Sequence, residues 1–241
     1  MPSRIRAVLM TGVLGVLAAC TPTTTGPMVM RMGPGLSNER FYQIGFRSGP
    51  RLNAPQLSER GELDGAFEGD AKPFDSEQWG IAYDGTVTLP LDERLSLHVG
   101  LQGEFFLAPV PGYGLYSGLS YYIGSRTVGL APAIAVRGAS DFGLGDTDST
   151  SSLFGMEGTC AFSVQPEPGM SLGLVPFVGV HQSLVNPGSQ VTSVYYGAVV
   201  AAQISLGEAG KSKLEVSGGF GRARANGSSW NVPIAGVRGG R

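Results

Sequence analysis

The sequence is poor in lysine, histidine, cysteine and charge. Its 241 residues include three lysines, two histidines and two cysteines, and Asp, Glu, Lys and Arg together make up 15%. The formal net charge of −2 argues against a nucleic-acid-binding protein, which typically has a basic surface. Two histidines far apart in the chain and so few cysteines cannot form a spaced metal-binding cluster, so we expect no metal ion and no other cofactor.

Glycine, by contrast, is abundant. The chain has 38 glycines, roughly twice the average share of about 7%. With 42% hydrophobic residues and little net charge, the chain is too hydrophobic to be intrinsically disordered. The glycines have no period of three, which excludes a collagen-like repeat, and Ala/Glu/Lys/Leu-rich heptads are absent, which excludes a coiled coil. These features favour a β-rich chain long enough for one domain.

The first twenty residues have the pattern of an export signal. Arg4 and Arg6 form a positive start, eleven mostly apolar residues follow at 7–17, and the stretch ends with Leu17-Ala18-Ala19-Cys20. The apolar run is too short for a membrane-spanning helix, which needs about 20 residues. The ending resembles the lipobox of bacterial lipoproteins. This resemblance implies a signal peptide at 1–19 that is cleaved before Cys20, and acylation of Cys20.

The residues after the cysteine bear on location and domain organisation. In lipoproteins an Asp directly after the cysteine commonly causes retention at the inner membrane, and Thr21 stands here instead. The resemblance therefore implies a cell outer membrane protein with a lipid anchor. Residues 20–38 are rich in Thr, Pro and Gly and are expected to form a lipid-anchored linker, while 39–241 form one β-barrel domain. An ordinary secretory signal with an incidental Cys20 is the alternative.

Apolar and polar residues alternate from about residue 39 onward, as in half-buried strands. Leu95, Leu97, Val99 and Leu101 share one strand face, and Ser96, His98 and Gln102 share the other. Strands are expected at 40–48, 79–89, 95–106, 113–123, 127–137, 152–164, 170–181, 193–206, 213–222 and 230–238. No convincing helix separates them, so antiparallel hairpins connect them. The fold class predicted is all-β, an antiparallel up-and-down β-barrel of about 8–10 strands.

The predicted connections alternate between short and long. Long connections are expected at 49–78, 138–151, 182–192 and 223–229, short ones at 90–94, 124–126, 165–169 and 207–210, and one of intermediate length at 107–112. Short turns on one rim and long loops on the other resemble small bacterial outer-membrane β-barrels. The resemblance is architectural, extends over about 39–238, and identifies no particular family.

The second strand face separates two interpretations. It consists mostly of Gly, Ala and Ser with a few charges, which suits the narrow lumen of a membrane-embedded barrel. A water-facing surface would carry more Lys, Thr, Glu and Arg. The lipid bilayer is then the expected partner, through acylated Cys20 and the barrel exterior, and no protein partner is indicated. The alternative is a lipid-tethered soluble periplasmic or surface β-barrel or sandwich that binds a ligand or partner. General porin activity is not expected, because side chains fill so narrow a barrel.

One pair of residues invites comparison with an enzyme family. His181 and Ser183 lie on one strand face and resemble the His/Ser pair of outer-membrane lipid A deacylases. In that family a Glu somewhat over ten residues downstream orients the His, whereas the next carboxylate here is Glu208. We therefore expect a structural, interaction or small-solute role without catalysis, and a barrel lipid hydrolase as a minor alternative. The Asp141, Asp146 and Asp148 loop lacks the ligand spacing of known calcium loops.

Overall fold

The computed structural model describes residues 27–32, 40–50, 79–104, 113–125, 127–140, 151–185, 189–206, 212–225 and 228–241. The strands in these ranges are β1 (Phe41–Pro50), β2 (Trp79–Pro90), β3 (Leu95–Glu104), β4 (Tyr113–Tyr121), β5 (Ile123–Gly124), β6 (Val128–Ser140), β7 (Ser151–Glu167), β8 (Met170–Val185), β9 (Ser189–Leu206), β10 (Ser212–Ala225) and β11 (Ser228–Gly240). Every range predicted to be a strand contains one, and the all-β prediction is confirmed.

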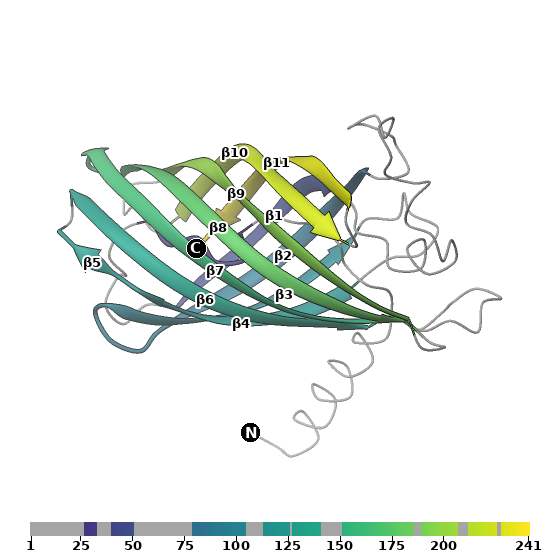
Figure 1. Ribbon diagram of the computed structural model, residues 1–241. Coiled ribbons are helices and arrows are strands. Elements are labelled where there is room, and N and C mark those ends of the chain that lie inside the picture. Colours follow the sequence, from purple (N-terminus) through teal and green to yellow (C-terminus); the bar gives the residue numbers. More distant parts are fainter. Residues whose placement is uncertain are drawn as a thin grey trace, which may run out of the picture.

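The strands close into one antiparallel barrel, seen as a ring of tilted strands in Figure 1. Neighbours in the chain pair with one another, and β1 pairs with β11 to complete the ring. Strands β4 and β5 both pair with β6, so they are two parts of one interrupted strand, and ten strands surround the lumen in the described ranges. Closure pairs the backbone N–H and C=O groups that the edge strands of an open sheet would leave exposed.

Tyr122 interrupts the strand between β4 and β5. Its backbone N–H donates to the carbonyl oxygen of Arg94, at 2.8 Å, and its hydroxyl donates to the carbonyl oxygen of Ser125, at 2.5 Å. Its ring is buried. Tyr122 is thus not part of the regular strand pairing. Its backbone and hydroxyl form hydrogen bonds with two short turns at the same rim instead.

The two faces of each strand meet different surroundings. In β3, Val99 and Leu101 are 41% and 48% exposed, whereas His98 and Gln102 are buried. The same alternation continues in β1, β4 and β6 to β11, and 26 large apolar side chains are exposed in the described ranges. The apolar face therefore points outward and the polar face points into the lumen, the reverse of a water-soluble barrel.

Two hairpins are longer than the sequence suggested. The predicted long connections at 182–192 and 223–229 are wrong, because the β8–β9 ladder continues to Val185 opposite Ser189 and the β10–β11 ladder to Ala225 opposite Ser228. Backbone pairing does not require apolar side chains, so polar composition misled the assignment. The Asn226-Gly227 dipeptide, the strongest sequence signal for a two-residue hairpin connection, stands between the paired residues Ala225 and Ser228.

The short connections occur where they were expected. Residues 91–94 link β2 to β3, and residues 168–169 link β7 to β8, with Gly169 at a φ of 88° that favours glycine. Of the long connections predicted at 49–78 and 138–151, residues 51–78 and 141–150 lie outside the described residues, and the remaining ends belong to β1, β6 and β7. Among the described residues, none belongs to a helix long and apolar enough to cross a membrane.

Candidate functional site: the barrel lumen

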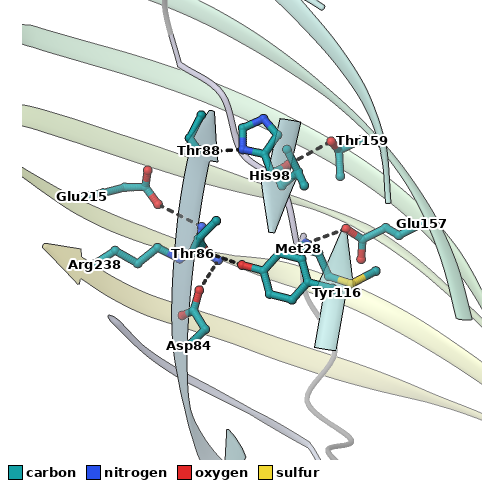
Figure 2. A network of polar contacts seen from close by, with 11 residues as sticks. Met28, Asp84, Thr86, Thr88, His98, Tyr116, Glu157, Thr159, Glu215 and Arg238 are labelled. Atoms are coloured by element: carbon teal, nitrogen blue, oxygen red, sulfur yellow. Dashed lines mark hydrogen bonds and ion pairs between the residues drawn. The ribbon is translucent and has the colours of Figure 1, made fainter. Parts of the chain in front are cut away.

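A short piece of chain from before the first strand lies inside the barrel. These residues, 27–32, are called the lumen segment below. The backbone N–H of Met28 donates to Glu157 Oε1 at 2.5 Å, and the Thr159 hydroxyl donates to the carbonyl oxygen of Val29 at 2.9 Å. Figure 2 shows Met28 beside Glu157, with the other labelled side chains around it. The segment falls within the stretch predicted to be a linker, and no sequence pattern indicated these contacts.

The lumen segment runs toward the rim that carries the short turns. Met28 contacts Glu157, which lies in the middle part of β7. Three residues later, Arg31 Nη1 donates to the carbonyl oxygen of Arg94 at 2.5 Å, in the turn between β2 and β3. The Arg31 guanidinium also lies 5.6 Å from the centroid of the Tyr122 ring, within cation–π range. The segment therefore spans the distance from mid-barrel to one rim.

Apolar contacts fix the rest of the lumen segment. Met28 and Val29 pack in a buried cluster with Tyr116 and Ala135, and Met30 packs against a second cluster that includes Tyr195. Met32 lies over Gly173, where an added Cβ would come within 2.5 Å of the Met32 sulfur. The small residues of the inner face thus leave room that the lumen segment fills.

An ion-pair cluster in the lumen joins β2, β10 and β11. Arg238 of β11 lies 3.0 Å from an Asp84 carboxylate oxygen and 3.8 Å from one of Glu215, and all three side chains are buried. To reach Asp84 on β2, Arg238 crosses β1 at Gly45, where a Cβ would meet the arginine Cγ at 2.4 Å. Charges inside a barrel need such partners, because an unpaired buried charge is costly (Figure 2).

A second polar chain joins β3, β6, β7, β8 and β9. Arg137 donates to Gln102 Oε1 at 3.3 Å and to His181 Nε2 at 2.6 Å. The His181 ring lies 4.6 Å from the Tyr195 ring, and the Tyr195 hydroxyl donates to Glu157 Oε2 at 2.5 Å. Glu157 therefore links this series of polar contacts to the lumen segment.

The two histidines have structural contacts. His98 is hydrogen-bonded through Nδ1 to the Thr88 hydroxyl at 3.0 Å and through Nε2 to the Ser120 hydroxyl at 2.7 Å. His98 is therefore part of a lumenal hydrogen-bond network. His181 is fully buried against Arg137, a cation, whereas activation of a serine would require an orienting carboxylate. Ser183 pairs with Leu153 in the ladder, and its side chain lies outside what the structure describes.

Several lumenal residues were not singled out from the sequence. Asp84 and Arg238 continue the inward period-two pattern of their strands, so that pattern could have identified them. Among the described residues, no group of three or more His, Cys, Asp or Glu is placed to hold a metal ion. Cys20 and the Asp141, Asp146 and Asp148 loop lie outside the described residues.

Comparison with known proteins gives distant structural matches alone. No protein-family model matches the chain, and no curated protein matches it. Similar solved structures include Neisserial surface protein A, with 10% identity, 83% of this chain and 94% of that chain covered, and a TM-score of 0.38. An outer membrane channel from Pseudomonas putida F1 has 10% identity, coverages of 90% and 99%, and a TM-score of 0.42. The outer membrane protease OmpT from Escherichia coli has 10% identity, coverages of 88% and 96%, and a TM-score of 0.36.

Proposed function

We propose that this protein is an outer-membrane lipoprotein whose ten-stranded barrel is embedded in the bilayer and whose Cys20 carries acyl chains. It would have a structural, interaction or small-solute role without catalysis. The observation that supports the membrane location is the orientation of the strands. Large apolar side chains are exposed around the outside, while Asp84, Glu157, Glu215, Arg137 and Arg238 are buried inside. Soluble monomers rarely expose so continuous an apolar surface.

Strand length and closure agree with this location. A membrane-crossing strand needs about 9–11 residues at a tilt near 45°. The shortest full-length strands, β1, β3 and β4, have 10, 10 and 9 residues. A closed barrel also satisfies backbone hydrogen bonds internally, which the hydrocarbon core requires. The longer strands β7 to β9 would project beyond the bilayer on the side opposite the short turns.

Fractionation of a Cys20→Ser variant tests this proposal. A barrel embedded by its own surface stays in the outer-membrane fraction, needs detergent for extraction, and keeps the gel mobility shift between unheated and heated samples. Release of folded Cys20→Ser protein into detergent-free buffer would instead identify a lipid-tethered soluble barrel and contradict the proposal.

Acylation is tested separately by metabolic labelling with a palmitate analogue. We expect label on the wild type and on Cys160→Ser, and none on Cys20→Ser. Cys160 is the matched control because it is the other cysteine of the chain. Label retained on Cys20→Ser would contradict lipidation at this residue.

The absence of catalysis is tested by the mass of lipid A. This mass should be the same in cells that express the wild type and in cells that express Ser183→Ala, and a difference would contradict the proposed role without catalysis.

A further inference from the structure

We propose that the lumen segment is a removable plug, and that the barrel wall beneath it is a binding path for an extended peptide. When residues 27–32 leave this path, the barrel conducts small ions. This inference rests on the proposed membrane location. It goes beyond that location because it assigns the lumen a ligand, an extended methionine-rich peptide that the chain itself supplies.

The wall recognises the segment as a peptide binding site would. Glu157 accepts the N–H of Met28, and Thr159, two residues further along β7, donates to the carbonyl oxygen of Val29. Both wall residues face inward from one strand. Backbone groups of an extended chain are thus satisfied by side chains of the barrel, which a segment that passed through by chance would not require.

The wall also leaves space for the segment. Glycines lie below Val29 and Met32: a Cβ on Gly118 would approach Val29 Cγ2 to 3.0 Å, and one on Gly173 would approach the Met32 sulfur to 2.5 Å. An extended chain needs a cross-section of about 4.7 by 10 Å, the spacings between strands and between sheets. Removing the segment would therefore free a path of about this cross-section through the half of the lumen between Glu157 and the rim with the short turns.

Counted over the residues whose burial the structure describes, the buried charges of the lumen balance only with the segment in place. Among the described residues, the buried carboxylates are Asp84, Glu157 and Glu215, and the buried guanidinium groups are Arg31, Arg137 and Arg238. Arg31 belongs to the segment, so its departure leaves an excess of negative charge on the wall. This charge favours return of the cationic segment, and it favours cations in the open passage.

Planar bilayer recording of the full chain tests the plug directly. Wild type is compared with a variant in which residues 27–32 are replaced by a Gly/Ser stretch of equal length. If the segment keeps the lumen closed about 99% of the time, its replacement raises the mean current about 100-fold. Added peptide Pro-Met-Val-Met-Arg-Met should reduce the current of the variant. The same peptide with Glu in place of Arg31 should reduce it less.

Two matched point variants keep the test informative if the replacement disturbs folding. Glu157→Gln removes the charge that accepts the Met28 N–H, and we expect about a tenfold rise in the ratio of open to closed time. Glu215→Gln makes the same chemical change beside Arg238, away from the segment, and we expect no rise. Equal opening of the two variants would overturn the plug, because it would indicate a general loosening of the lumen.

The failure of this inference is distinguishable from failure of the proposed function. The inference is overturned if the Gly/Ser variant inserts, keeps its heat-dependent mobility shift and carries no more current than wild type. In that case the wall alone closes the lumen and the membrane location stands. If wild type itself does not insert into bilayers, the proposed function is contradicted, and this inference with it.

Discussion

The outer and inner faces of the same strands obey different rules. Val99 and His98 are neighbours in β3, yet Val99 is exposed among apolar side chains while His98 is buried between Thr88 and Ser120. Outward positions need only be apolar, so one residue there is nearly equivalent to another. Inward positions depend on particular partners. The type of residue, apolar or polar, is therefore enough to explain the outer face. The inner face can be explained only by the specific contacts that each side chain makes.

The largest effect is expected from removing the cation at the centre of the inner ion-pair cluster. Arg238→Met removes the guanidinium group that Asp84 and Glu215 face in the lumen. Breaking a buried ion pair in this way typically lowers the free energy of unfolding by about 3–5 kcal/mol. Urea unfolding of the barrel in lipid vesicles measures the loss. The triple variant with Asp84→Asn and Glu215→Gln should recover most of it, and a single variant as stable as wild type would show that the cluster contributes nothing.

A charge on the outer face should have the next largest effect. Leu174→Arg places a cation on the exterior of β8, five residues beyond Gly169 and so near the middle of a membrane-crossing stretch of about 9–11 residues, where it costs about 2–4 kcal/mol if lipid surrounds it. Leu91→Arg, in the turn at the rim, is the matched control and should cost only about 0–1 kcal/mol. Both wild-type residues are exposed and apolar. Equal, small costs in vesicle unfolding would indicate that water covers the exterior.

Glycine substitutions compare the two faces at nearly one level of the barrel. Gly179 faces inward, and a Cβ there would lie 2.3 Å from the Tyr195 ring, whereas Gly158 has nothing within 4 Å of its Cβ position. Gly179→Ala should destabilise the barrel by about 1–3 kcal/mol through overpacking. Gly158→Ala should change stability by less than about 0.5 kcal/mol. The same unfolding assay decides, and a reversed order would contradict the assignment of faces.

The smallest effect is expected outside the barrel wall, at Asp92 in the turn between β2 and β3. Backbone N–H groups of Leu95 and Arg94, each 2.6 Å from its carboxylate, lower the pKa of Asp92 below its usual value. The hydrogen bonds to the ionised Asp92 carboxylate therefore stabilise the folded state at pH values above the unfolded-state pKa, about 3.9. This stabilisation is lost as the pH falls through the folded-state pKa. An NMR titration of this carboxyl group that gave a normal or raised pKa would contradict it.

The sequence predicted the barrel well because the relevant signals are local. The period-two alternation in Leu95–Leu101 depends only on neighbouring residues, and it located all ten strands. The hairpins beyond Val185 and Ala225 were missed because pairing there depends on the backbone rather than on apolar side chains.

The contents of the lumen could not be predicted in the same way. Met28 and Glu157 are 129 positions apart in the chain, and no local pattern connects residues so distant. Strand alternation shows that Arg238 and Asp84 face inward, but it does not show that β1 brings them together across Gly45. The abundance of small residues on the inner face was visible from the sequence, and the structure adds that a chain segment fills the space.

The most direct test of the membrane location is a spin label on the outer face of β3. The label is attached at Val99→Cys in a Cys160→Ser background, with the protein in outer-membrane vesicles. The account predicts that the label collides readily with oxygen, which concentrates in lipid, and rarely with a water-soluble nickel complex. Easy access of the nickel complex to position 99, with the barrel folded, would show that this face meets water and would contradict the account.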